Sequence, residues 1–208
     1  MIRQLLNCVL LLSAFTISGC TVFPLPEPPR IMDLGTDGAP TVLPQTHNAS
    51  LRVETPLASA PFDGSRILIK PTPYEFQAIR EARWRDTAPI MIRDHVISHV
   101  RTSQAFRNAI VDTSPANAEL TLVSELTAFH VMHQNSKLHV IIRLHTELVQ
   151  NNQRESICVH NWNIMEPVAD SQQESIVQGF SKAANRLGND LTGWMAECVE
   201  QSHKAAQN

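Results

Sequence analysis

The sequence predicts a single α/β domain, because three strand-like segments and two helix-like segments occupy one continuous stretch of the chain. From 138 to 145, apolar residues take every second position, which is typical of a half-buried strand. Segments of similar length at 120–133 and 156–165 are separated from it by polar turn sequences, so we expect an antiparallel meander. A long helix is expected over 172–200. Its apolar stripe recurs every three or four residues and consists of Ile176, Phe180, Ala184, Leu187, Leu191, Trp194 and Cys198.

The residues before the meander predict further strands and the other helix. Residues 51–54 alternate in hydrophobicity, and 66–70 is a short apolar run followed by prolines, so both are typical of strands. Residues 74–83 are expected to be extended. A helix is expected over 86–104, with a side-chain oxygen as its N-terminal cap and a proline in its first turn. A short strand is expected at 109–111.

Composition limits both the class of protein and its partners. The chain has 208 residues, with 17 basic and 20 acidic side chains and a formal charge of −3. It therefore lacks the basic excess that binding to nucleic acid requires. Hydrophobic residues make up 43% and charged residues 18%, which is typical of a chain with a core and not of a disordered one. Without Arg3 of the signal peptide the chain would carry 16 basic and 20 acidic side chains, a charge of −4, so we expect the domain not to bind anionic headgroups by charge.

The N-terminus has the pattern of a bacterial lipoprotein signal. An uncharged run of 14 residues, 5–18, leads directly into Gly19 and Cys20. A helix needs about 20 apolar residues to cross a membrane, so residues 1–19 are interpreted as a cleaved signal peptide. Cys20 would carry the diacylglycerol and become the acylated N-terminus. An ordinary secretory signal with an incidental cysteine is the alternative. Because Thr21 stands where aspartate would signal retention in the inner membrane, we expect the periplasmic face of the outer membrane.

A proline-rich segment separates the expected anchor from the expected domain. Residues 21–61 contain eight of the 13 prolines together with polar clusters. Residues 20–50 are therefore interpreted as a tether, and 51–203 as the folded domain. Within the tether, residues 30–34 could dock as an edge strand.

The cysteines are consistent with an oxidising compartment. Cys8 would leave with the signal peptide, and Cys20 would be acylated. Cys158 and Cys198 remain, and they could form one disulfide in the periplasm or stay as free thiols.

The sequence contains none of the common catalytic or cofactor motifs. Its seven glycines form neither a dinucleotide-binding nor a P-loop pattern, and it has neither a nucleophile elbow nor a zinc-protease helix motif. We therefore expect no enzymatic activity, no catalytic residues, no cofactor and no metal. The nine histidines are interpreted as solvated or edge side chains, because His95 and His99 lack a third ligand and His130 and His133 point to opposite faces of a strand. The three tryptophans are interpreted as structural.

The order of several degenerate motifs resembles a known family. The lipoprotein signal, the proline-rich segment and the short strand at 30–34 are followed by the run 66–70, Tyr74 and Ala82-Arg83-Trp84 before a helix that ends at Phe106. A closing helix carries Trp194-Met195. This order resembles the ABC-type transport auxiliary lipoproteins, and within them the PqiC-like outer-membrane lipoproteins of MCE lipid transport systems. The chain departs from the pattern at Ile31-Met32, where members tend to carry an aromatic residue.

The resemblance implies both a fold and a function. It implies a mixed, largely antiparallel sheet with two helices packed on one face, and no catalysis. It also implies an accessory role beside an MCE-domain protein and an inner-membrane transporter, with a contribution to envelope integrity. Two alternatives stay open: a general outer-membrane assembly lipoprotein, and a periplasmic metal-binding or hydrolytic lipoprotein that would use the histidines. Formation of a homo-oligomer is also left open.

Overall fold

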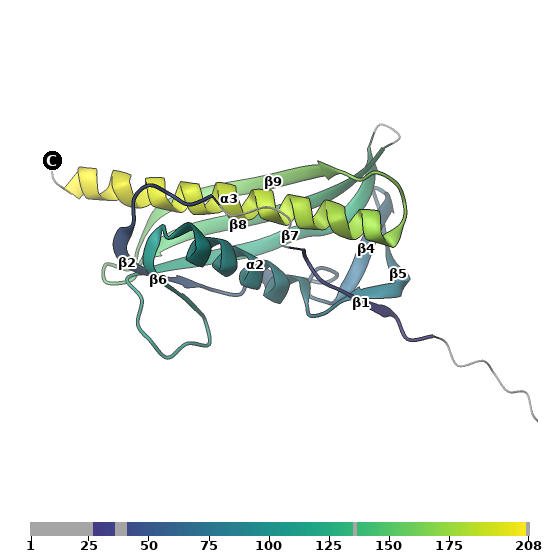
Figure 1. Ribbon diagram of the computed structural model, residues 1–208, viewed down its shortest axis with the longest axis horizontal. Coiled ribbons are helices and arrows are strands. Elements are labelled where there is room, and N and C mark those ends of the chain that lie inside the picture. Colours follow the sequence, from purple (N-terminus) through teal and green to yellow (C-terminus); the bar gives the residue numbers. More distant parts are fainter. Residues whose placement is uncertain (1–26, 36–40, 135–136, 207–208) are drawn as a thin grey trace, which may run out of the picture.

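The computed structural model describes residues 27–35, 41–134 and 137–206, and within them nine strands form one mixed sheet (Figure 1). Helices α2 (Ala88–Ser103) and α3 (Gln173–Ala206) lie together on one face of this sheet. The expected α/β architecture, with a mixed sheet and two helices on one face, is confirmed. The expected signal peptide and Cys20 lie outside the described residues.

The three long strands form the expected meander. They are β7 (Leu120–Gln134), β8 (Lys137–Gln150) and β9 (Glu155–Pro167), and each neighbouring pair is antiparallel. The alternation in β8 has the expected sense at Val140, Ile142 and Leu144, which are buried, and at Arg143, which is exposed, although Ile141 on the other face is buried as well. This meander forms the surface on which α3 packs.

The other edge of β7 is shared by three strands that run parallel to it. These are β2 (His47–Val53), β3 (Leu57–Ala58) and β4 (Arg66–Thr72). Strand β6 (Phe106–Val111) extends the sheet beyond β2 and begins three residues earlier than expected.

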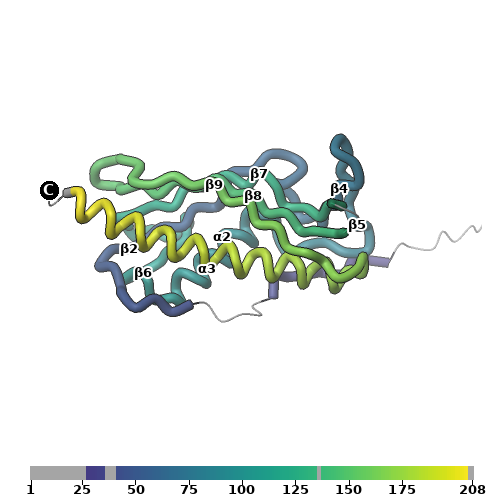
Figure 2. The backbone as a smooth tube through the Cα atoms, turned by 90° about the horizontal axis from the view of Figure 1, so that it is seen from above, coloured from purple at the N-terminus to yellow at the C-terminus, as the bar shows by residue number. Residues whose placement is uncertain are grey.

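The antiparallel hairpin of β4 and β5 (Glu75–Trp84) forms the end of the molecule opposite the C-terminus (Figures 1 and 2). Residues 82–84 of β5 pair in parallel with β1 (Arg30–Met32). The expected docking of residues 30–34 as an edge strand is therefore confirmed.

The tether expected over residues 20–50 is too long, because part of it belongs to the fold. Strand β1 pairs with β5, Leu34 is buried in the core, and β2 begins at His47. The expected domain boundary at residue 51 therefore falls inside a strand. Residues 45–48 are polar, and for this reason the sequence indicated a tether there. In the structure His47 is nevertheless buried, with its ring centroid 5.8 Å from that of Phe106.

The start of α2 differs from the expected cap. Thr87 is the N-cap residue, but its side chain makes no capping hydrogen bond. Instead, the Asp86 carboxylate accepts a hydrogen bond from the Thr87 backbone N–H at 2.7 Å. The proline in the first turn is present, and the helix ends at Ser103, followed by the C-cap residue Gln104 with a left-handed φ of 57°. Among the described residues, no helix is long and apolar enough to cross a membrane.

Helix α3 packs on the sheet and on α2 at the same time. All of its expected stripe except Trp194, which is half-buried, is buried in the core. Gly188 faces α2, and a Cβ atom added there would lie 2.6 Å from Cγ of His99. The small residue therefore permits the close approach of the two helices.

Gly188→Ala is expected to lower the free energy of unfolding by about 1–3 kcal/mol, because the added methyl group would force the His99 ring or the helix to move. Gly193→Ala is the matched control in the same helix, since a Cβ atom there meets nothing within 4 Å. The control should gain up to about 1 kcal/mol from helix propensity. Urea unfolding of both variants checks the difference, and equal stabilities would contradict the proposed contact.

Candidate functional site

Of the three cysteines singled out from the sequence, Cys158 and Cys198 lie in the described part of the chain and Cys20 does not. Cys158 of β9 and Cys198 of α3 form a disulfide with their Cα atoms 6.1 Å apart. This separation lies in the range that disulfides adopt without backbone strain. The bond would tie the edge strand of the meander to the helix that covers it.

Thiol counting on the denatured protein is expected to find two additional thiols after reduction, from Cys158 and Cys198. The double variant Cys158→Ser/Cys198→Ser should lower the free energy of unfolding by about 2–4 kcal/mol, because it removes a disulfide that closes a long loop of the chain. The loop spans 40 residues. Reactive thiols in the unreduced protein from an oxidising compartment would show that the pair is unbonded.

The interpretation of the histidines as solvated or edge side chains is wrong for several of them. His95, His99 and His130 are only 8%, 3% and 4% exposed. His95 and His99 lie one turn apart on the face of α2 that meets α3, with ring centroids 4.6 Å apart. Burial, together with the neighbouring His99, lowers the pKa of His95 to about 4. Burial also lowers the pKa of His99.

His130 lies in a small aromatic cluster on the other face of the sheet. Its ring stacks on Phe62 at 5.9 Å and meets the edge of Phe76 at 5.3 Å. Burial and the charges of Lys70 and Arg143 lower its pKa to about 4. The described residues contain no group of three or more histidine, cysteine, aspartate or glutamate side chains placed to hold a metal ion.

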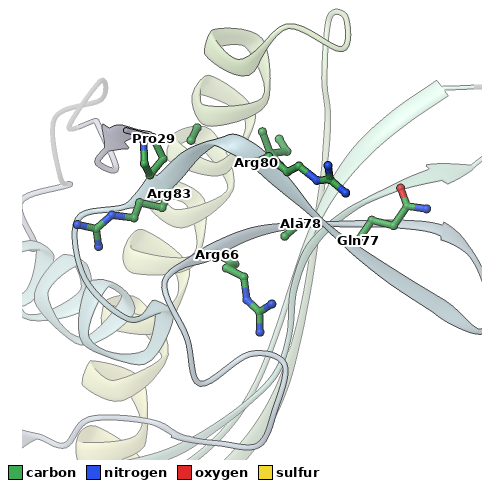
Figure 3. A pocket seen from close by; sticks show the side chains of 8 residues that line it. Pro29, Arg66, Gln77, Ala78, Arg80 and Arg83 are labelled. Atoms are coloured by element: carbon green, nitrogen blue, oxygen red, sulfur yellow. The ribbon is translucent and has the colours of Figure 1, made fainter. Parts of the chain in front are cut away.

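The feature of the described surface with the clearest chemical character is a cavity of about 720 Å³ on the β4–β5 hairpin (Figure 3). We call it the arginine cavity, because Arg66 of β4 and Arg80 and Arg83 of β5 line it, together with Gln77 and Pro29. Figure 3 shows the three guanidinium groups pointing outward in different directions around the opening. They do not converge on one point.

Strand register explains how two of these arginines come together. Arg66 and Arg83 are cross-strand partners, and Ile31 of β1 is the partner of Arg83 on its other side. Partners in register lie on the same face of a sheet, so Ile31, Arg83 and Arg66 form a row across three strands. Like charges directly opposite each other on neighbouring strands are destabilising. The row is therefore unfavourable for stability unless an anion lies against it.

The arginines of the cavity also lack the partners that other arginines have. Among the described arginines, only Arg66, Arg80, Arg83 and Arg154 form no ion pair and no hydrogen bond to another residue through the guanidinium. Three of these four line the same cavity. Arg30, close by, is satisfied by Glu174 at 2.6 Å. The unpaired guanidinium groups can donate hydrogen bonds to phosphate or carboxylate oxygens from outside the chain.

Sequence reasoning missed this surface because it used the net charge. Some of the acidic side chains that make the total negative are paired, as Glu119 is with Arg107, and Glu81 lies beside Arg80 without an ion pair to any described residue. The spacing of residues 66, 80 and 83 gives no periodic signal, since the pairing depends on a register shift in the hairpin. Only the observation that Arg83 precedes the buried Trp84 in an alternating strand could have placed it on the outer face.

Comparisons with known proteins identify relatives of the chain and of its fold. The family model of ABC-type transport auxiliary lipoprotein components matches residues 33–192. Protein XCC0632 from Xanthomonas campestris is similar in structure, with a TM-score of 0.71 and 20% identity over 85% of this chain and 97% of that one. The hypothetical protein CT253 from Chlamydia trachomatis has a TM-score of 0.50 and 7% identity over 74% and 98% of the two chains. At such identities the likeness shows a shared fold. A search of curated proteins found no match.

Proposed function

The chain belongs to the family of ABC-type transport auxiliary lipoprotein components, and from this premise we propose that it is a non-enzymatic accessory subunit of an MCE/ABC-type intermembrane lipid transport system. In this role it is anchored to the periplasmic face of the outer membrane through Cys20. The observation that carries the proposal is the family match, which covers residues 33–192 and so includes all the described elements from β2 to most of α3.

The layout of the chain supports a docking role. Acyl chains at Cys20 hold the N-terminus at the membrane, since two or more buried chains give stable anchoring. The segment between Cys20 and β1 is short, so the domain stays near the membrane surface. A partner rooted in the inner membrane then meets a domain confined to a thin layer, which raises its effective concentration. The accessory subunit would thereby hold the periplasmic end of the lipid conduit at the outer membrane.

Co-purification tests the partner. A tagged full-length protein, extracted with detergent from its own cells, is expected to retain an MCE-domain protein and subunits of the inner-membrane transporter. Cys20→Ala should lose most of this retention while the domain stays folded, because the tethered search is gone. Cys8→Ala is the matched control, since it removes a cysteine of the signal peptide that carries no lipid. The mass of the complex also reports whether the chain forms a homo-oligomer.

Two further measurements complete the test. Intact mass of the extracted protein should show an acylated chain that begins at Cys20, and cells without the protein should become sensitive to detergent. Recovery of outer-membrane assembly factors in place of the MCE-domain protein would favour the alternative role in assembly. Loss of the protein with no envelope phenotype and no MCE-domain partner would overturn the proposal.

A further inference from the structure

We propose that the row Ile31, Arg83 and Arg66, with Arg80 beside it, is the surface by which the domain rests on the headgroup phosphates of the membrane that holds its lipid anchor. This inference rests on the anchoring part of the proposed function and is independent of the transport partner. It assigns a ligand class, anionic phospholipid, to the arginine cavity and gives the domain a defined orientation.

The position of the anchor puts this surface next to the membrane. Ile31 lies eleven positions after Cys20, so even a fully extended segment holds β1 within about 40 Å of the acylated residue. Pro29, which also lines the arginine cavity, lies even closer to Cys20 along the chain. No other strand of the described sheet is as near to Cys20 in sequence. The surface beside β1 is therefore the part of the fold that the anchor constrains most.

The side chains of the row suit a headgroup layer. Guanidinium groups form paired hydrogen bonds with phosphate oxygens, and arginine is less strongly hydrated than lysine. Ile31 is 58% exposed, which leaves an apolar side chain beside Arg83 that can lie at the boundary between headgroups and acyl chains. The adjacent strand positions point the other way, because Ala82 and Trp84 are buried.

The geometry favours a surface of many phosphates over one small anion. A site for a single phosphate gathers its donors around one point, whereas Arg66, Arg80 and Arg83 point in different directions (Figure 3). Separate headgroups can satisfy each of them. The mature charge of −4 led to the expectation that the domain does not bind anionic headgroups. Attraction to an anionic surface falls off within about one Debye length, so it depends on the charges that face the surface and not on the total.

The contact would orient α3 away from the membrane. The first turn of α3 lies beside β1, as the ion pair between Arg30 and Glu174 shows. From there the helix continues for 34 residues, which is about 50 Å. Its C-terminal end lies at the opposite end of the molecule (Figure 1). That end would then face the periplasm, where a partner from the inner membrane approaches.

Hydrogen exchange of the membrane-bound protein tests the contact. The acylated full-length mature protein is reconstituted into vesicles of phosphatidylcholine alone or of an equal mixture of phosphatidylcholine and phosphatidylglycerol. Both arms contain the acyl anchor, so its contribution cancels. In the mixed vesicles we expect exchange in residues 77–83 and 30–32 to be slower by at least about fivefold, the factor that one arginine near an anionic surface corresponds to. Added salt should remove the effect.

Matched variants separate the row from a general effect of charge. Arg66→Gln/Arg83→Gln should abolish the slower exchange, whereas Arg154→Gln, at another exposed arginine without a partner, should retain it. Neither variant should have a lower melting temperature, because these side chains are exposed and unpaired, and Arg66→Gln/Arg83→Gln also removes two like charges from opposite positions. Soluble glycerol phosphate is the competing arm. Protection by glycerol phosphate in the absence of vesicles would assign the cavity to a free anion and overturn the proposal.

Two other outcomes would also overturn it. Equal exchange in the two kinds of vesicle, from a protein whose intact mass shows the acyl chains, would reject the docking surface and leave the anchor and the proposed function intact. A mature protein without fatty acid would reject the anchor and the docking surface together.

Discussion

Trp84→Ala is expected to lower the free energy of unfolding by about 3–5 kcal/mol, the loss typical of a large aromatic side chain removed from a core. Trp84 is fully buried, and its ring meets Phe180 edge-on at 5.0 Å and Phe129 at 5.6 Å. These three rings join β5, β7 and α3, so the cavity left by alanine would lie where the sheet and the long helix meet. Urea unfolding measures the loss, provided that the free energy of unfolding depends on urea concentration with the same slope in the variant and the wild type.

Two further variants locate the cause of this loss. Trp84→Phe should cost only about 1–2 kcal/mol, because it keeps an aromatic ring and removes an indole N–H that has no hydrogen-bond partner among the described residues. Tyr74→Ala, in the β4–β5 turn, should be nearly neutral, since Tyr74 is 97% exposed. If Trp84→Ala unfolds at the same urea concentration as Tyr74→Ala, the aromatic contact is not a main source of stability.

The position of Trp84 illustrates what the sequence could predict about the fold. Long segments with a clear period, such as β8 and α3, were predictable because their apolar faces are wide and regular. For Trp84 itself the sequence indicated only a structural role. Its role in the core depends on Phe129 and Phe180, which are 45 and 96 positions away, and no local pattern reports such a contact.

Short strands and surface pairings were harder to predict for the same reason. Strand β2 begins within a polar stretch, which gives no hydrophobic pattern to predict it from. It is held by pairing with β6 on one side and β7 on the other. The row of Ile31, Arg83 and Arg66 exists only through the registers of two separate strand pairs. The anchor at Cys20, by contrast, is a local motif, so the sequence predicts it without any knowledge of the fold.

For the buried histidines, one feature follows from a local pattern and another depends on a distant contact. The spacing of His95 and His99 predicts that they share a helix face, but the period of α2 alone does not say that this face meets α3. Gly188 makes the contact possible by allowing the His99 ring to lie against the backbone of α3. A metal site and a packed pair of neutral imidazoles have the same spacing, and the packing of the second helix decides between them.

The free energy of unfolding is expected to fall by about 2 kcal/mol for each of His95 and His130 when the pH drops from above 7 to about 5. Both side chains have a pKa of about 4 in the folded protein, below the ordinary value of 6.5. The unfolded chain therefore binds protons first as the pH falls, which favours unfolding. His99 contributes in the same direction because its pKa is also lowered.

The histidines and the carboxylates change the free energy of unfolding in different ranges of pH. Hydrogen bonds from the Ser50 side chain and backbone, together with Arg107, lower the pKa of Glu119 to about 2, so its stabilising effect is lost only below its ordinary value of 4.5. Between pH 6.5 and about 4.5 the histidines therefore dominate the change in stability. Below about pH 4 the histidines are protonated in both states, and their contribution stops changing.

Urea unfolding at about pH 7.5, 6 and 5 measures this loss, and substitution assigns it. His130→Gln should reduce the dependence of stability on pH, because the group that titrates is removed from the cluster of Phe62 and Phe76. His133→Gln is the matched control, since His133 lies three residues further along the same strand with its side chain exposed. His95→Gln should act as His130→Gln does, and the two effects should add, because His95 on α2 and His130 on β7 lie on opposite sides of the sheet and titrate independently. The dependence that remains in the double variant is the share of His99. A wild-type protein that is equally stable at pH 7.5 and 5 would show that these imidazoles gain protons without disturbing the packing of α2 and β7.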